Sequence, residues 1–259
     1  MSDYIGTETQ VALQRKCVDQ HARIMASRGA VQTARMCGTD DPDRYGWDRL
    51  AEALEEDGFV GFRLLRRDHL ANLHAWVDRC GAQLDCWDVF TAEAAAIALR
   101  PDPKVPPDYT ILRGPEAVER GLLPAIQSCM AAQGVAPMPA PFLRGDLGPC
   151  SLAAILDGDG RVVCTAFSHF PHNAHSPYRN WAWSGLVATM PEARGQGLAV
   201  AAHVAVLKGI AGAHGAERAY ALARPENAAS VRMLEKCGMT HMADRVSCMA
   251  RLGAARLTR

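Results

Sequence analysis

Before residue 100, apolar positions recur mostly at helical spacing. One apolar stripe runs over 11–25 at intervals of seven, and another runs over 70–80 at intervals of three and four. The segments GFVGFRLL (58–65) and CWDVF (86–90) are instead short apolar runs, which are typical of strands. The pattern predicts a helix-rich N-terminal part that contains two short strands.

After residue 106 the pattern changes to alternating strands and helices. Strands are predicted by short apolar runs, at 109–114, on both sides of the DGDG turn at 157–160, at 180–190, at 218–224 and at 246–252. Helices are predicted by longer segments, at 116–133 with a break at Pro124, at 198–211 and at 227–238. Asn227 is the expected N-cap of the last helix, and Gly238 is its expected left-handed stop. The predicted order is β-α-β-β-β-α-β-α-β, so the fold class is mixed α/β.

The two patterns meet at a proline-rich connection, RPDPKVPPDY (100–109). It contains four prolines, which lack an N–H group and disfavour helix at the preceding residue. We therefore expect a linker or a rigid lead-in to a strand. This divides the chain into an N-terminal domain, 1–105, and a C-terminal domain, 106–259.

Composition limits the classes of partner. The 259 residues are 49% hydrophobic, and 28 basic side chains balance 28 acidic ones. This balance argues against nucleic acid or an anionic membrane as the main partner. No apolar run reaches the roughly 18 residues of a spanning helix, and the start MSDYIGTETQ lacks a signal-peptide profile, so a cytoplasmic protein is expected. Nine cysteines without CxxC spacing predict small buried side chains rather than a metal finger or a disulfide framework.

The stretch MPEARGQGLAVAAH (190–203) carries the clearest chemical signal. Gly195 and Gly197 stand directly before a helix, where backbone N–H groups lack partners and the helix dipole favours an anion. Glycines let the backbone approach phosphate oxygens closely, and Arg194 adds a cation. A Walker loop would need Lys and Ser/Thr after the last glycine, and a dinucleotide fingerprint would need glycine at Val200. The stretch therefore predicts a different kind of pyrophosphate site.

This stretch resembles the acyl-CoA-binding motif of the GNAT superfamily of N-acetyltransferases, Arg/Gln-x-x-Gly-x-Gly/Ala. Arg194, Gly197 and Ala199 match it. The family's second landmark, an Asn that opens a helix ending in Gly-Phe, is matched by Asn227 and Gly238, with methionine in place of the phenylalanine. The resemblance covers about 107–252 and implies the GNAT fold, a central mixed and splayed sheet flanked by helices, here with an N-terminal helix-rich extension.

The resemblance also implies an acyl-CoA site. Backbone groups of the strand would bind the pantetheine arm, with one N–H near the thioester carbonyl, and the loop would hold the pyrophosphate. The residues it implies are Val187, Ala188, Thr189, Arg194, Gly195, Gln196, Gly197, Leu198, Ala199, Asn227 and Ser230. The alternative is a glycine turn that binds no ligand.

The chain departs from the family at the catalytic positions. Leu234 stands where many members carry a tyrosine acid, and NWAWSGLVATM lacks the carboxylate base. A base is expected instead in SHFPHNAHSPYRNW, with His172 as first candidate and His175 as second. A metal held by His169, His172 and His175, and a solvated loop or substrate-binding wall without catalytic histidines, are the alternatives.

Together these features predict an acyl-CoA-dependent N-acyltransferase that moves acetyl from acetyl-CoA to a primary amine of a small molecule or peptide, without a metal. The N-terminal domain would form part of the substrate cleft or a homo-oligomer interface. A non-catalytic acyl-CoA sensor with the same fold is the alternative function. A tandem protein with a degenerate N-terminal copy is disfavoured, because no glycine motif precedes residue 92.

Overall fold

The computed structural model describes residues 3–254 and Leu257. Its strands are β1 (Cys37–Thr39), β2 (Phe59–Arg66), β3 (Gln83–Glu93), β4 (Thr110–Arg113), β5 (Cys150–Leu156), β6 (Val162–His169), β7 (Trp181–Thr189), β8 (Arg218–Ala223) and β9 (Thr240–Arg251). Its α-helices are α1 (Glu8–Asp19), α2 (His21–Ala26), α3 (Pro42–Tyr45), α4 (Trp47–Asp57), α5 (Leu70–Arg79), α6 (Ala94–Ala98), α7 (Gly114–Glu119), α8 (Leu123–Ala132), α9 (Ala140–Arg144), α10 (Leu198–His214) and α11 (Ala228–Lys236). Two 3₁₀ turns, η1 (Arg67–His69) and η2 (Pro191–Ala193), complete the described elements. In this part of the chain, no helix has the length and apolar character needed to cross a bilayer.

All the strands belong to one mixed sheet in the order β1-β2-β9-β3-β8-β7-β6-β5-β4. Its central feature is the parallel pair β7 and β8. These two strands are paired only where Trp181–Trp183 meets Arg218–Tyr220. Beyond that point β7 runs on to Thr189 with β6 on one side and no strand on the other. The sheet is therefore splayed between β7 and β8, as the predicted fold requires.

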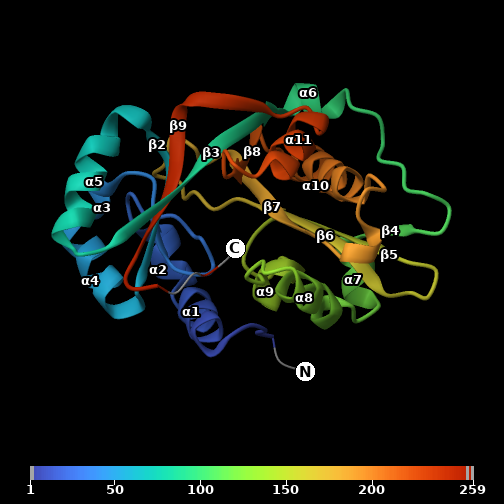
Figure 1. The fold of residues 1–259 in the computed structure, drawn as a ribbon, viewed down its shortest axis with the longest axis horizontal. Coiled ribbons are helices and arrows are strands. Elements are labelled where there is room, and N and C mark those ends of the chain that lie inside the picture. Colours follow the sequence, from blue (N-terminus) through green and yellow to red (C-terminus); the bar gives the residue numbers. More distant parts are fainter. Residues whose placement is uncertain (1–2, 255–256, 258–259) are drawn as a thin grey trace.

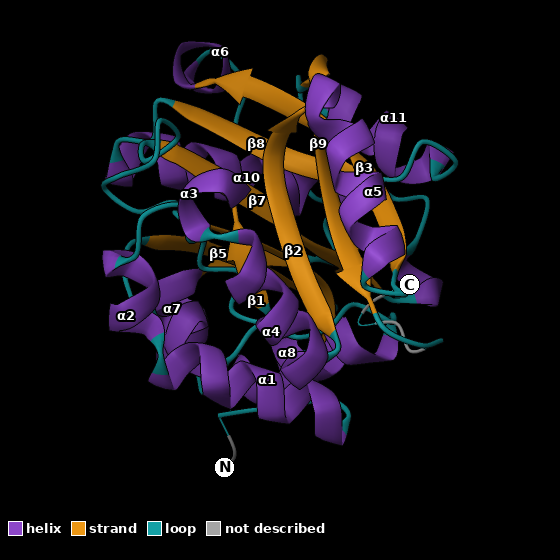
Figure 2. Cartoon of the chain, turned by 90° about the vertical axis from the view of Figure 1, so that its left-hand side faces the viewer, coloured by secondary structure: helices purple, strands orange, loops and turns teal. Residues whose placement is uncertain are grey.

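Helices cover both faces of the C-terminal part of the sheet (Figure 1). Alternation along β5 shows how the sequence directs this: Leu152 and Ala154 pack in the cluster that contains α7, α8 and α9, whereas Ala153 and Ile155 pack against α10. In the N-terminal part, α4 and α5 lie on β2 and β9, as Figure 2 shows from that side. Trp76 of α5 and Phe62 of β2 form an edge-to-face contact in that core.

The predicted elements after residue 106 are confirmed, and so is the fold class. The helix expected over 116–133 breaks before Leu123 and continues as α8, with Pro124 in its first turn, where a missing N–H costs nothing. Asn227 caps α11 by accepting a hydrogen bond from the N–H of Ser230 at 3.1 Å. Gly238 has φ +81°, as expected for the residue that ends the helix. The strands expected at 58–65 and 86–90 are β2 and β3, whereas β1, α3 and α4 were not predicted.

The sheet does not divide at the proline-rich connection. β3, from the N-terminal part, lies between β8 and β9 and is hydrogen-bonded to both. Residues 101–108 have no regular secondary structure and link α6 to β4. Whether 1–105 and 106–259 fold as separate domains therefore stays a prediction, but their strands form a common sheet.

One pair of cysteines departs from the expectation of free thiols. Cys86 of β3 and Cys248 of β9 are directly opposite in the antiparallel register and form a disulfide across 162 positions of sequence. The remaining cysteines are free, and four of them, Cys17, Cys129, Cys164 and Cys237, are buried. Strand pairing between distant segments brings the bonded pair together, which is why cysteine spacing did not reveal it.

Candidate functional site

The loop before α10 presents a row of unpartnered backbone donors. Gly195 and Gly197 adopt left-handed φ angles of +79° and +80°. Gly197 is the N-cap of α10 and supplies no side-chain cap. Within the described chain, no acceptor is paired with the N–H groups of 195–200. A Cβ atom at either glycine would meet no atom within 4 Å, so the loop borders open space. This is the geometry of an anion site at a helix N-terminus.

The space in front of this loop is a cleft of about 240 Å³, here called the loop cleft. Its cationic side chains are Arg194 from the loop and Arg232 and Lys236 from α11, and no Asp or Glu of the described chain lines it. Arg194 donates from Nη2 to Oε1 of Gln133 at 2.7 Å, which holds the side chain beside the cleft. The cations and the backbone donors together favour a guest with several negative charges.

The strand that leads to the loop cleft carries a β-bulge. Between Thr165–Ala188 and Phe167–Gly185 the register of β6 and β7 shifts, so two residues of β7 oppose one of β6. Leu186 has φ +53°, a rare angle for a branched residue, and its carbonyl accepts a hydrogen bond from the Thr165 hydroxyl at 3.0 Å. The bulge re-aims backbone groups of β7 at the point where the strand has lost β8 as a neighbour.

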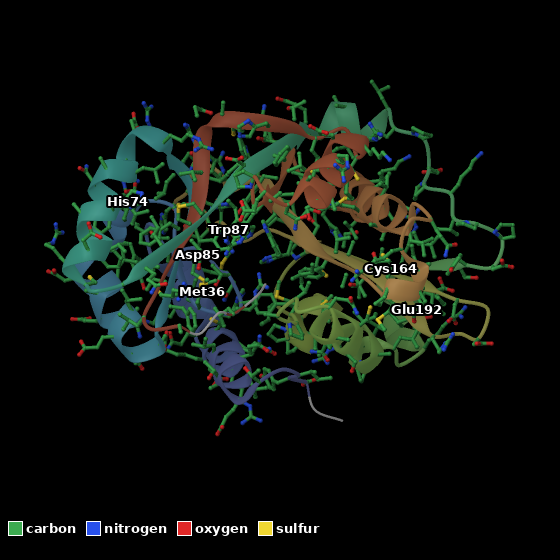
Figure 3. All side chains as sticks on the ribbon, in the orientation of Figure 1. Met36, His74, Asp85, Trp87, Cys164 and Glu192 are labelled. Atoms are coloured by element: carbon green, nitrogen blue, oxygen red, sulfur yellow. A yellow bond between two sulfur atoms is a disulfide. The ribbon has the colours of Figure 1, made fainter. Side chains whose placement is uncertain are left out.

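A larger central cavity of about 610 Å³ lies along this open edge of β7. Thr189, Arg194 and Ala199 line both spaces, so the central cavity adjoins the loop cleft. From the N-terminal part, the cavity is lined by Arg35, Met36, Arg63 and Trp87. Figure 3 shows Met36 and Trp87 left of the middle, and Glu192, which precedes the glycine loop, at the right. The N-terminal part thus supplies one wall of the cavity.

Almost all of the predicted cofactor residues lie around these two spaces. Val187, Ala188, Thr189, Arg194, Ala199, Asn227 and Ser230 line the central cavity, and Gly195, Gly197 and Leu198 line the loop cleft. Gln196 lines neither and donates instead to the hydroxyl of Tyr109 at 2.8 Å. Leu234, at the position of the family's acid, lines the central cavity.

The predicted catalytic histidines do not line the cavity. The His172 ring is fully buried; its Nδ1 lies 2.7 Å from Asp40 Oδ2, and its Nε2 lies 3.0 Å from the Tyr220 hydroxyl. Burial lowers the pKa of His172, although the bond to Asp40 opposes that shift. His175 is exposed on the loop before β7. A catalytic role for either histidine remains a prediction, since neither ring lines the cavity.

Another histidine, which the sequence did not single out, does line the cavity. His203 of α10 is buried, with Nε2 2.7 Å from the hydroxyl of Ser184 on β7. Burial lowers the pKa of His203 to about 4, so the ring is neutral at neutral pH. Its place on the buried face of α10, one turn after Ala199, was the available signal.

Metal ligands do not gather around the histidine motif. Across the described chain, no group of three or more His, Cys, Asp or Glu side chains is arranged to hold an ion. The ring of His169 packs edge-on against Phe142 and Trp183, apart from the Asp40–His172 pair.

Comparisons with known proteins agree with the fold and the loop. Residues 144–240 match the family model described as an acetyltransferase (GNAT) domain. A GCN5-related N-acetyltransferase from Kribbella flavida is similar over 93% of this chain and 96% of its own, with 16% identity and a TM-score of 0.60. A Drosophila protein is similar over 96% of this chain and 91% of its own, with 13% identity and a TM-score of 0.60.

A tandem GNAT protein from the clavulanic acid biosynthesis pathway is similar over 85% of this chain and 76% of its own, with 15% identity and a TM-score of 0.52. No curated protein sequence matches the chain. The matched family segment begins just before β5 and ends at the start of β9, so it contains β7, the glycine loop and α11. Residues 144–240 are therefore similar to an acetyltransferase (GNAT) domain, and the chain shares the fold of the GCN5-related structure.

Proposed function

We propose that this protein is an acyl-CoA-dependent N-acyltransferase that moves acetyl from acetyl-CoA to a primary amine of a small molecule or peptide. One observation carries the proposal: the cationic loop cleft opens along the unpaired edge of β7 into the central cavity. An extended pantetheine arm that runs from a charged diphosphate to a thioester matches this path. The cytoplasmic location and the homo-oligomer interface remain predictions.

In this proposal the loop cleft binds the diphosphate. The N–H groups of 195–200 would donate to phosphate oxygens, and Arg194, Arg232 and Lys236 would supply positive charge. The Oδ1 of Asn227 already caps α11, so only its amide NH₂ is free to donate into the central cavity. Ser230, in the first turn of the same helix, lines the cavity beside it.

The open edge of β7 would hold the pantetheine arm as a neighbouring strand would. Backbone donors of Val187, Ala188 or Thr189 would stabilise the oxyanion that forms when the amine nitrogen attacks the thioester carbon. A C–N bond forms and the C–S bond breaks. The nitrogen loses a proton, and the departing thiolate gains one.

Proton removal from the amine is the harder of the two transfers. An alkyl amine with a pKa near 10.4 lies about 3.4 units above pH 7, roughly 4.6 kcal/mol, whereas a thiol near 8.5 costs roughly 2 kcal/mol. The central cavity favours the neutral amine, because Arg35, Arg63 and Arg194 line it without a carboxylate partner among the described residues, whereas Asp85 offsets the charge of Arg224. Leu234 in the acid position is compatible with these costs, since release of the thiolate depends less on a proton donor than attack depends on deprotonation of the amine.

The test is consumption of the acetyl-CoA thioester in the presence of panels of amines, amino acids and peptides, with release of free thiol as the readout. We expect turnover with a subset of amines and formation of the N-acetyl product by mass spectrometry. Thioester hydrolysis without acetylated amine, across all panels, would contradict the proposal.

A non-catalytic acyl-CoA sensor is the second candidate, because Leu234 replaces the acid and no carboxylate lines the described cavity wall. A sensor would bind acetyl-CoA in calorimetric titration yet show no thiol release with any amine. Binding together with turnover excludes it.

A further inference from the structure

Two arginines in the central cavity have no counter-ion. Arg35 and Arg63 are each 8% exposed, and both line the cavity. The side chain of Arg63 makes no hydrogen bond or ion pair with any described residue. Arg35 donates from Nη1 to the carbonyl of Ala136 at 3.2 Å, while its buried Nε has no partner. Burying a charge without a partner is unfavourable, so each guanidinium is held there at a cost to stability.

Elsewhere the fold does provide counter-ions for buried arginine. Arg251, the other buried arginine of the described chain, lies 2.9 Å from the carboxylate of Asp85, which also pairs with Arg224 at 3.0 Å. Arg35 and Arg63 pair with no such carboxylate among the described residues, and the charge of Arg63 disfavours the charge of Arg35. Burial and the charge of Arg63 lower the pKa of Arg35 to about 10, so Arg35 remains cationic at neutral pH; burial also lowers the pKa of Arg63.

The backbone beside each arginine is strained. Among the described non-glycine residues, only Ala34, Leu64 and Leu186 have positive φ, at +61°, +53° and +53°. Ala34 precedes Arg35, Leu64 follows Arg63, and Leu186 is the bulge residue of β7 in the same cavity wall. Backbone strain of this kind persists where surrounding contacts impose it, and it gathers at binding sites.

Those contacts are present. The hydroxyl of Thr33 accepts from the N–H of Met36 at 3.1 Å, and the amide oxygen of Gln32 accepts from the N–H of Ala34 at 2.8 Å. The N–H of Leu64 donates to the Ser247 hydroxyl at 3.1 Å. The Arg35 guanidinium lies 5.6 Å from the ring centroid of Trp183, three residues before the β7 bulge. These contacts fix the backbone next to both arginines before any substrate binds.

We propose that Arg35 and Arg63 together bind a carboxylate of the acceptor, so that the acceptor class is an amine that also carries a carboxylate, as amino acids do. This rests on the proposed function, since it names the acceptor of the same site. A carboxylate accepts from two guanidinium groups with charge-assisted hydrogen bonds and supplies the charge that the cavity lacks. One carboxylate leaves the pair with a net positive charge, so the amine is still favoured in its neutral form.

The activity test compares amino acids with their own carboxamides, using acetyl-CoA as donor. The wild type should show a kcat/KM about 100-fold higher for the free acids. Arg63→Gln and Arg35→Gln should each remove that preference, because they lower kcat/KM for the acids far more than for the amides. Arg66→Gln, on the same strand but exposed and paired with Asp68, is the control and should keep the preference.

A second arm distinguishes the source of the carboxylate. Succinyl-CoA carries a carboxylate on its acyl group, so it is tested with neutral amines. If Arg63→Gln lowers turnover of succinyl-CoA and not of the amino acids, the arginines bind the carboxylate of the acyl group, and the proposal is overturned. Equal kcat/KM for acids and amides in the wild type also overturns it.

A binding arm does not depend on turnover. N-acetyl amino acids, the expected products, should raise the Tm of the wild type and of Arg66→Gln, but not the Tm of Arg63→Gln, whereas their carboxamides should leave all three unchanged. Stabilisation by N-acetyl amino acids without turnover would support the carboxylate site and reject the acyltransferase. Turnover of neutral amines without any effect of a carboxylate would support the acyltransferase and reject the carboxylate site.

Discussion

Gly197 offers the most direct test of the loop cleft. It is exposed at the N-cap of α10 with φ +80°, and a Cβ atom there would meet nothing within 4 Å. The side chain introduced by Gly197→Glu would therefore extend into the loop cleft without displacing protein atoms. Its left-handed backbone costs about 1–2 kcal/mol of folding stability, which is a separate effect from binding.

The loss of affinity follows from charge. A carboxylate about 5 Å from a phosphate charge repels it by roughly 1–3 kcal/mol, for an effective dielectric constant between about 80 and 20. A diphosphate carries two such charges, so we expect a total of about 2–6 kcal/mol. This corresponds to roughly a 30-fold to 10⁴-fold increase in the Kd of acetyl-CoA.

Gly215→Glu is the matched control. Gly215 ends the same helix with φ +69°, is exposed, and also has nothing within 4 Å of a Cβ position. Both variants should lose similar folding stability, whereas only Gly197→Glu should lose acetyl-CoA affinity in calorimetric titration. Equal affinity in wild type and Gly197→Glu would refute the assignment of the loop to the diphosphate.

Three further predictions concern other parts of the chain. Limited proteolysis should first cut within 100–108, where the backbone has no regular structure, yet the fragments should co-elute because β3 pairs with β8 and β9; first cuts inside the C-terminal part would contradict this. Between about pH 6.5 and pH 4 the unfolded chain binds a proton at His203 that the folded state excludes, so the free energy of unfolding should fall as the pH falls. His203→Gln should reduce this pH slope by about 1.4 kcal/mol per pH unit in denaturant titrations. An unchanged slope would refute the prediction. In a pH–rate profile, activity should rise from about pH 6 to 9. Replacement of His172 or, failing that, His175 should lower kcat on the order of 100-fold, whereas Leu234→Tyr should change the rate little. Full activity in both histidine variants would reject these histidines as the base.

The elements around the loop cleft could be predicted because their signals are local. A glycine loop before an alanine-rich segment, and an Asn that caps the next helix, each specify backbone geometry within a few residues. The two cations that α11 adds to the loop cleft were not predicted, although Arg232 and Lys236 stand four residues apart and therefore lie on one face of that helix. That spacing, next to a predicted phosphate loop, was a usable signal.

The central cavity could not be predicted in the same way, because its walls come from distant segments. β3 reaches the cavity by pairing with β8, more than 120 positions later in the chain, and no local pattern specifies that register. The sequence did contain a signal for Arg63, because it is the one charged residue within the apolar run GFVGFRLL. A charge in a fully buried strand needs a partner, and here the described chain does not supply one.

Charge distribution, rather than total charge, decides what this fold can bind. The chain is formally neutral, which argued against anionic macromolecules, yet the cationic side chains that line its two spaces have no carboxylate beside them in the lining. Among the lining cations of the described chain, only Arg224 pairs with carboxylates, those of Asp85 and Glu226, and neither of these residues lines the two spaces. A concave wall of one sign focuses potential, so it raises the local concentration of small anions without making the whole surface attractive to nucleic acid. Two anionic substrates that meet at the β7 bulge, one held at the loop cleft and the other at Arg35 and Arg63, would satisfy both groups of cations at once.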